Sequence, residues 1–378
     1  MAGRHSKKGG ISEMSAPVEA HDPQPRPKWS LREATIEDRD GILALRSLVF
    51  GIEDPEKRSP AFWEWEFMQN PRGPARIYVA EDEGTIVGHY AIIPQKFSFP
   101  DRTPVMGSIV VDVMTHPAYR FQGMFKKIGR FALTSAADTT VFATGYPIRK
   151  EVMPGHLSIG WTAELQIPVL LKPLRWSSLA KRFGLPGGRL YDVMSRIARW
   201  RPFRAPMPTG WTIRALTTED VGAMADVATT FAEEDLIHQI RDADFLRYRY
   251  FSNPLWPYEA WGLYAGKELA AYVVSRESKM LDTASLAIVD MACNPSGGGA
   301  VETLVRHVLA EAATRDLAVA GAMITKGNRY HRALRRAGMF PGPHKFNLIL
   351  FALQADFSDS LVDPKNKWFL NWGDTDDV

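Results

Sequence analysis

Cysteine is nearly absent from this sequence, with Cys293 alone among 378 residues. A single cysteine excludes an intrachain disulfide and any metal site built from several cysteines, and it fits a reducing compartment such as the cytoplasm. The sequence also lacks the run of about 18 apolar residues that a membrane-spanning helix needs. Its first residues, MAGRHSKKGG, have no apolar segment of the kind found in signal peptides. We therefore expect a cytoplasmic protein without a transmembrane segment or a bound metal.

A strong charge of either sign is also missing. The 46 basic and 43 acidic side chains leave a formal net charge of +3. This excess is too small for the basic surface typical of nucleic-acid-binding proteins, so no nucleic-acid partner is predicted. With 45% hydrophobic residues, the chain can build ordinary cores, and its length suits two domains of roughly 100–200 residues.

The stretch Gly107–Leu133 has the pattern of a strand, a turn and a helix. Its first residues are rich in valine and isoleucine, and Pro117 cannot donate a ladder hydrogen bond, so the strand should end near Thr115. Apolar residues recur at helical spacing from about Gln122 onward. Gly123 removes a side chain where the unpaired N–H groups of a first helical turn point outward. This geometry binds phosphate.

The run VMTHPAYRFQGMF resembles the acyl-CoA-binding signature of the GCN5-related N-acetyltransferase (GNAT) superfamily, in which a hydrophobic strand precedes T-x-P-x-Y-R-x-x-G. The resemblance implies that the strand end meets the acyl-pantetheine arm and that the loop and helix start hold the pyrophosphate. The CoA-binding residues that it implies are Val113, Met114, Thr115, Arg120, Phe121, Gln122, Gly123, Met124 and Phe125. Phe125 is a departure, because the signature usually ends in glycine or alanine. The alternative interpretation is an ordinary strand-to-helix turn.

Two residues are candidates for proton transfer. His156 stands where members of the superfamily often have a tyrosine that protonates the leaving thiolate; alternatively, it satisfies a local hydrogen bond. Asp112 is the first candidate for the base, because a carboxylate in an apolar strand is costly unless it is used or paired. A structural role for Asp112 is the alternative, since Asp290 occupies the matching place in a second copy of the pattern.

That second copy is an internal repeat. WTIRALTTEDVGAMADVATTF resembles WSLREATIEDRDGILALRSLVF, and SLAIVDMACNP resembles SIVVDVMTHP, in the same order along the chain. The loop of the second copy, Pro295–Ala300, is rich in glycine but lacks the arginine. We therefore predict a structural or acceptor-binding role for this copy. Phosphate binding at its glycine-rich helix start is the alternative.

These patterns predict an α+β protein of two tandem GNAT-like domains, each with its own mixed, mostly antiparallel twisted sheet flanked by helices. The predicted boundaries are a disordered tail at 1–28, a GNAT domain with the acyl-CoA site at 29–172, a basic aromatic connector at 173–208, a degenerate GNAT-like domain at 209–355 and a C-terminal tail at 356–378. The connector is interpreted as a helical link with its charges in water. A surface for an anionic membrane or a polyanionic glycan is the alternative. The aromatic and acidic tail could cover the cleft between the copies.

The function that the resemblance implies is transfer of an acyl group, with acetyl from acetyl-CoA as the first expectation. The acceptor would be a primary amine of a small molecule or amino sugar, which attacks the thioester directly. The second copy is expected to help to shape the acceptor pocket. Two other functions are open: a tRNA-dependent aminoacyltransferase of the tandem GNAT-like type, and a non-catalytic acyl-CoA-binding module.

Overall fold

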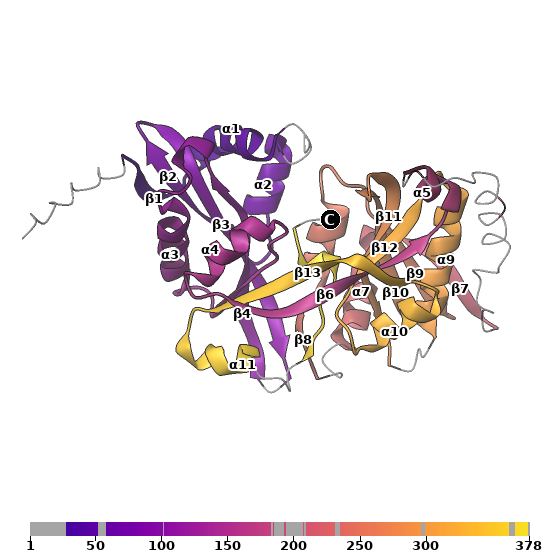
Figure 1. The fold of residues 1–378 in the computed structure, drawn as a ribbon. Helices are drawn as coiled ribbons and strands as arrows, with labels where there is room; N and C mark the ends of the chain where they lie inside the picture. The colour runs from indigo at the N-terminus through magenta and orange to yellow at the C-terminus, as the bar shows by residue number, and fades with distance from the viewer. Residues whose placement is uncertain are drawn as a thin grey trace, which may run out of the picture.

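The computed structural model describes residues 28–51, 58–100, 102–182, 184, 193, 207, 209–230, 235–295, 299–362 and 367–376. They form two lobes joined by a central pair of long strands (Figure 1). No helix in these ranges combines the length and apolarity that a membrane crossing requires.

The first lobe contains the strand, turn and helix predicted for Gly107–Leu133, with further strands and helices on both sides. Its elements are β1 (Ser30–Glu33), α1 (Arg39–Phe50), α2 (Pro60–Met68), β2 (Arg76–Asp82), β3 (Thr85–Phe99), β4 (Arg102–Thr115), α3 (Met124–Ala136), β5 (Phe142–Gly145), α4 (Met153–Leu157) and β6 (Thr162–Pro173). The next helix, α5 (Trp176–Arg182), lies on the second lobe. Strand β4 ends at Thr115, as Pro117 predicted, and α3 begins two residues later than expected.

The second lobe repeats this order. Its elements are β7 (Trp211–Leu216), α7 (Val221–Ala228), β8 (Leu236–Gln239), α8 (Ala243–Leu246), the π-helix Arg247–Phe251, β9 (Glu259–Ala265), β10 (Glu268–Met280), β11 (Thr283–Cys293), α9 (Ala300–Thr314), β12 (Val319–Met323), α10 (Arg329–Arg336) and β13 (Phe340–Ala352). The chain ends with α11 (Ser358–Val362) and β14 (Lys367–Trp368). Tandem copies of one fold are thus confirmed.

The two copies exchange strands. The sheet runs in the order β1-β2-β3-β4-β5-β13-β6-β12-β11-β10-β9-β7, so β13 of the second copy lies between β5 and β6 of the first. Conversely, β6 of the first copy pairs with β12 of the second through Val169–Pro173. In Figure 1, β6 and β13 run side by side between the lobes.

The prediction of two separate sheets was therefore wrong, because all the main strands form one sheet. The physical reason lies in the short strands β5 and β12. Each pairs with its own copy on one edge and leaves the other edge open, and an open edge accepts any strand with suitable register. Sequence alternation identifies a strand but not the partner that covers its edge.

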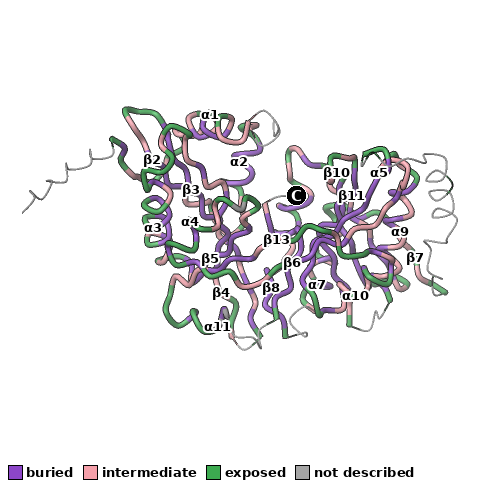
Figure 2. Tube along the Cα trace, viewed as in Figure 1, coloured by how far each residue is buried: buried purple, intermediate pink, exposed green. Residues whose placement is uncertain are grey.

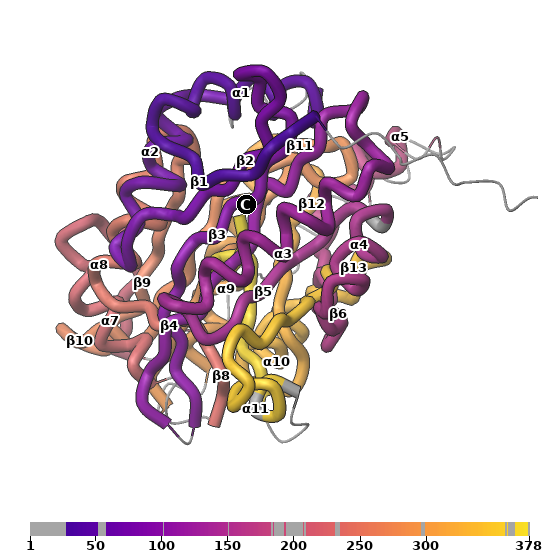
Figure 3. Tube along the Cα trace, turned by 90° about the vertical axis from the view of Figure 1, so that its left-hand side faces the viewer, coloured from indigo at the N-terminus to yellow at the C-terminus, as the bar shows by residue number. Residues whose placement is uncertain are grey.

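The core follows this shared sheet. In Figure 2 the buried parts of the trace lie along the central strands of both lobes, while the outer helices are partly exposed. Figure 3 shows α3 lying across the strands of the first lobe, where Ile128 and Ala132 are fully buried against Tyr90 and Tyr78.

The C-terminal tail packs between the lobes. Strand β14 pairs with β8, and the rings of Trp368 and Phe142 lie 6.2 Å apart. Phe369 and Leu370 are completely buried. The described part of the tail is thus a structural element of both copies.

The connector is described only at its start. There Arg175 pairs with Asp316 and Arg182 with Asp282, so this part packs on the second lobe. Most of the predicted basic aromatic segment, and the tail predicted as disordered except for Lys28, lie outside the described residues.

Candidate active site

The candidate site begins where β4 and β5 separate. These parallel strands pair only at Ser108–Val110 with Ala143–Gly145, after which β5 ends and β4 continues. Opposite β3, β4 has an irregular register at Asp112, whose φ of 49° lies in the left-handed region. Such a bulge bends the strand locally. The result is an opening between the two strands, as the resemblance implied.

A cavity of about 450 Å³ occupies this opening. It is lined by Arg46, Phe50, Val110, Val111, Asp112, Val113, Gly145, Tyr146, Pro147, Ile148, Arg149, Val152, His156, Ile349 and Asp376. The cavity therefore contains Asp112, Val113 and His156 from the predicted site. It also contains one residue of β13 and one of the C-terminal tail.

The loop from Arg120 to Gly123 lies beyond the end of the same strand. Gly123 is the N-cap of the 13-residue helix α3, with a φ of 76°, and a Cβ atom there would meet nothing within 4 Å. The Gln122 side chain donates to the carbonyl oxygen of Ala118 at 3.1 Å. Arg120 is exposed, and Phe121 is fully exposed with a φ of 63°. A helix start with an arginine beside it suits a phosphate group.

Met114 and Met124 have a different position from the other predicted CoA residues. Each is only 1% exposed, and both belong to the core. Thr115 is partly buried and pairs with Gly88 at the end of β4. Met114 and Met124 therefore can offer a ligand backbone groups rather than side chains.

The departure at Phe125 is explained by its neighbour Gly155. A Cβ atom on Gly155 would come within 2.7 Å of the Phe125 ring, so only glycine leaves room for this side chain. The ring also meets the imidazole of His156 edge-on, at 5.0 Å between centroids. A bulky residue at the end of the signature thus packs under α4 and leaves the loop itself open.

His156 is buried between two aromatic rings, Phe125 and Trp161, at centroid distances of 5.0 and 5.3 Å. Its Nδ1 atom has no hydrogen-bond partner among the described residues. Burial lowers the pKa of His156 to about 4, so the imidazole is neutral at pH 7. The structure therefore shows no local hydrogen bond at Nδ1 that would explain this histidine.

The carboxylate of Asp112 forms an ion pair with Arg46 of α1, and both side chains are about 95% buried. The backbone carbonyl of Asp112 accepts a hydrogen bond from Nδ1 of His89 at 2.6 Å. Burial lowers the pKa of His89 to about 3, which keeps it neutral. These contacts hold the bulge of β4 on both sides.

Asp290, the matching residue of the second copy, is also paired. Its carboxylate accepts hydrogen bonds from Arg241 at 2.9 Å and from the hydroxyl group of Tyr250 at 2.9 Å. Arg241 donates in addition to Asp374 of the tail. Both repeated aspartates thus have a buried arginine partner, which is what the structural interpretation of Asp112 expects.

Several residues that line the cavity were missed by the sequence analysis. No motif in the sequence marked Arg46, Tyr146 or Arg149 as residues of the site. Ile349 and Asp376 had no local signal, because strand exchange and tail packing bring them from the far end of the chain. The aromatic and acidic composition of the tail was the only indication that it had a role near the cleft.

The family comparison agrees with this geometry. Residues 30–162 match a family model described as an acetyltransferase (GNAT) domain. No curated protein sequence matches this chain.

Solved structures match over both lobes. A GCN5-related N-acetyltransferase from Anabaena variabilis has a TM-score of 0.62 and 10% identity, covering 86% of this chain and 73% of its own. A probable N-acyltransferase from Enterococcus faecalis has a TM-score of 0.61 and 12% identity, with 87% and 73% covered. N-myristoyltransferase of Saccharomyces cerevisiae with bound myristoyl-CoA has a TM-score of 0.60 and 14% identity, with 90% and 81% covered. At these identities the matches establish the fold.

The signature loop, the opening between β4 and β5 and these matches lead to one conclusion: residues 30–162 form a GNAT domain, and the chain as a whole has a tandem GNAT-like fold.

Proposed function

We propose that this protein transfers an acetyl group from acetyl-CoA to a primary amine of a small molecule or amino sugar by direct attack. The observation that carries the proposal is the 450 Å³ cavity at the separation of β4 and β5, on the strand that leads to the Arg120–Gly123 loop. A donor held by this loop would have its thioester at the cavity. The amine would enter from the opposite side.

The donor would be held in two places. The pyrophosphate would be bound by the N–H groups at the start of α3 and by Arg120, which can form paired hydrogen bonds to phosphate oxygens. The acyl-pantetheine arm would lie along β4 at Val113–Thr115, with backbone N–H groups of this strand facing the carbonyl oxygen as it gains charge. This arrangement uses the part of β4 that β5 leaves uncovered.

In the reaction the amine nitrogen would form a bond to the carbonyl carbon, and the bond from carbon to sulfur would break. The nitrogen must lose a proton, and two cavity carboxylates can receive it directly or through water: Asp112, which is paired with Arg46, and Asp376 of the tail. The leaving thiolate gains a proton.

The groups beside the sulfur would be His156 and Tyr146. Burial and the carboxylates of Asp374 and Asp376 raise the pKa of Tyr146 well above its usual value, so its hydroxyl group stays protonated. Both side chains are neutral at pH 7 and line the cavity, so both suit hydrogen bonding to the thiolate. In this form His156 would donate a hydrogen bond to the leaving sulfur, and its role in protonating the thiolate stays a prediction.

The acceptor side combines apolar and charged groups. Phe50, Ile148 and Ile349 offer apolar surface, while Arg149 and Asp376 supply one charge of each sign. This lining suits a small amine that also carries an apolar part. Because Ile349 and Asp376 come from the second copy and the tail, their positions support a role of the second copy in acceptor recognition.

The first experiment is ligand-dependent thermal unfolding. Acetyl-CoA should raise the melting temperature by the linkage amount RT ln(1 + [L]/Kd), and tRNA should not. Release of free thiol with a panel of amines then tests turnover, and acyl-CoAs of increasing chain length test the donor. The proposal fails if no acyl-CoA at millimolar concentration changes the melting temperature. Binding without thiol release from any amine would favour a non-catalytic module.

A further inference from the structure

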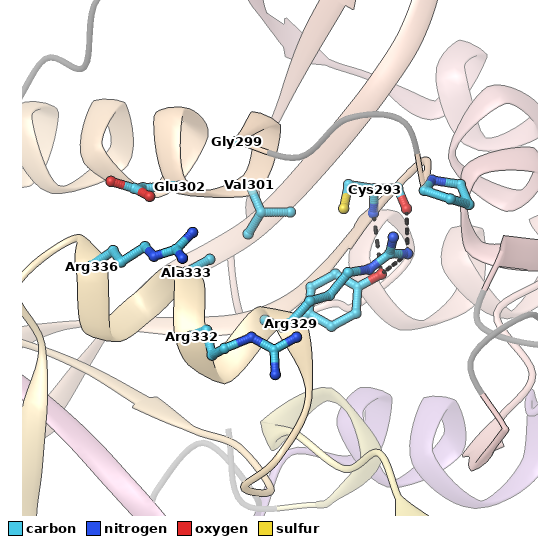
Figure 4. Close-up of a pocket in the computed structure, with 10 residues that line it drawn as sticks. Cys293, Gly299, Val301, Glu302, Arg329, Arg332, Ala333 and Arg336 are labelled. Carbon is cyan, nitrogen blue, oxygen red and sulfur yellow. Dashed lines mark hydrogen bonds between the residues drawn. The ribbon is translucent and has the colours of Figure 1, made fainter.

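The second copy has a cavity of its own, of about 280 Å³. It lies between the end of β11, the first turn of α9 and one face of α10 (Figure 4). Its lining residues are Cys293, Pro295, Gly299, Val301, Glu302, Arg329, Tyr330, Arg332, Ala333 and Arg336. By the repeat, the end of β11 and the start of α9 correspond to the end of β4 and the start of α3. The cavity therefore occupies the place that the pyrophosphate would take in the first copy.

The walls of this cavity are strongly basic. Arg329, Arg332 and Arg336 lie on α10 and reach the cavity in Figure 4. The sequence from Lys326 to Arg336 contains five lysine or arginine residues and no aspartate or glutamate. The first copy has its arginine in the loop, whereas the second copy supplies its arginines from α10.

The acidic residue of the cavity is already engaged. Glu302 forms an ion pair with Arg306 on the same helix at 2.9 Å, and Arg306 also donates to the backbone carbonyl of Arg336. The positive charges around α10 also act on His331. Burial lowers the pKa of His331, and the charges of Arg335, Lys326 and Arg332 lower it further.

The place of the acyl-pantetheine arm, in contrast, is closed in this copy. The backbone N–H of Cys293 donates to the hydroxyl oxygen of Tyr330 at 3.4 Å, and the carbonyl oxygen of Cys293 accepts from Arg329 at 2.7 Å. Tyr330 is completely buried and packs on Phe369 of the tail at 5.1 Å between ring centroids. Cys293 corresponds to Thr115 in the repeat, so internal partners occupy the strand end that a thioester arm would need.

From these contacts we propose that the cavity of the second copy binds the phosphate or pyrophosphate group of a small phosphorylated ligand, without an acyl arm and without catalysis. Guanidinium groups form paired hydrogen bonds to phosphate oxygens, which suits Arg332 and Arg336, while Arg329 donates to Cys293 and adds its charge to the cavity wall. Ligand pockets for whole drug-sized molecules are about 300–1,000 Å³, so a cavity of 280 Å³ fits the charged end of a ligand. A nucleotide and the nucleotide end of CoA both carry this group.

The test uses the full chain with the first site disabled by Gly123→Asp. Calorimetric titration with inorganic pyrophosphate, ADP and CoA should show one remaining site. ADP and CoA should bind with affinities within about threefold of each other, because the arm contributes nothing, and the affinity should fall as salt rises. CoA binding without ADP binding would show that the pantetheine arm of CoA contributes to binding, and it would contradict the proposal that the place of this arm is closed in the second copy.

The matched pair of variants localises the site. In the Gly123→Asp background, Arg332→Ala with Arg336→Ala should weaken pyrophosphate binding at least tenfold. Arg247→Ala with Lys267→Ala removes the same charge from exposed positions outside the cavity and should change the affinity less than twofold. Equal affinities of the two double variants, or no binding of any probe at millimolar concentration, would refute the site.

The wild-type chain gives a second, independent measurement if Gly123→Asp does not fold. It should bind pyrophosphate at two sites, and Arg332→Ala with Arg336→Ala should leave one. A single site that this double variant leaves unchanged contradicts the proposal, as does binding of long RNA without binding of pyrophosphate.

Discussion

Ile349 on β13 lies directly opposite Gly145 on β5, and both residues line the cavity of the first copy. The last strand of the second copy is therefore part of the sheet on which the candidate active site is built. The tail reinforces this contact, since Trp368 packs near Phe97 and Phe142 of the first copy.

This pairing predicts that the first copy does not fold by itself. A fragment ending at residue 184 loses β13 between β5 and β6, and both strands would expose unpaired backbone groups. We expect it to aggregate or to lack a cooperative unfolding transition. The full chain, cut at a protease site inserted within residues 185–208, should in contrast elute as one species in size-exclusion chromatography. A folded first-copy fragment with full acetyl-CoA affinity and an unchanged KM for the amine would contradict this prediction.

The loop gives the second prediction. Gly123→Asp places a carboxylate where the pyrophosphate would meet the start of α3, so acetyl-CoA-dependent thiol release should fall below detection. The fold should survive, because the site around Gly123 is open and the left-handed φ of 76° costs only about 1–2 kcal/mol in an L-residue. Circular dichroism and thermal unfolding provide the check on folding. Gly184→Asp, at another glycine with positive φ and open surroundings, is the control and should keep full activity.

The ion pair of Arg46 and Asp112 gives the third prediction. Asp112→Asn leaves a buried arginine without its counter-charge and should reduce the free energy of unfolding by about 3–5 kcal/mol. Adding Arg46→Met should restore most of that loss, since an apolar side chain can replace the buried charge. Asparagine is chosen because it tolerates the left-handed backbone at this position. Urea unfolding of the two single variants and the double variant measures the coupling.

The activity of the same double variant separates the two roles of Asp112. A general base contributes about 10²–10⁴-fold, so a stable double variant with kcat reduced by at least 100-fold would identify Asp112 as the base. Recovery of both stability and kcat would assign Asp112 a structural role. In that case Asp376→Asn is the next variant to measure, because its carboxylate also lines the cavity.

The fourth prediction concerns pH. Burial lowers the pKa of His89 to about 3 and those of His156 and His238 to about 4, whereas an unfolded histidine has a pKa of about 6.5. Below pH 6.5 the unfolded chain therefore binds more protons than the folded chain. The free energy of unfolding keeps its full value above that pH and decreases as the pH falls. Each histidine should cost about 2 kcal/mol at pH 5.

Asp374 has the opposite effect on the pH dependence of stability. Its burial raises its pKa to about 6, so the folded state binds a proton between pH 6 and 4 that the unfolded state does not, which offsets part of the loss. Urea unfolding at pH 7.5 and pH 5 should show a smaller loss in His238→Gln than in the wild type, by up to about 2 kcal/mol. The exposed His344→Gln should match the wild type. If the free energy of unfolding fell equally in all three proteins between pH 7.5 and pH 5, protonation of His238 would not be a cause of the acid sensitivity.

Much of the local structure could be predicted from the sequence. The valine-rich strand before Pro117, the open glycine at the start of α3 and the doubled pattern of strands and helices are local signals, because backbone preferences act over a few residues. The resemblance of Val113–Phe125 to the GNAT signature placed a loop between a strand and a helix, and the structure has one between β4 and α3. The residue that departs from the signature, Phe125, could be explained only by Gly155 across the fold.

The sequence alone thus determined two copies of an acyltransferase fold, and it determined which copy carries the signature loop. Only the tertiary structure decided that β6 and β13 each pair with strands of the other copy, that Arg46 neutralises Asp112 and that Ile349 and Asp376 complete the cavity. It also decided that arginines of α10 surround the second cavity. The physical reason is that strand alternation and helical spacing report on neighbours along the chain. The choice of partner for an open strand edge or a buried charge is made between residues far apart in sequence, by packing and electrostatics that no local pattern records.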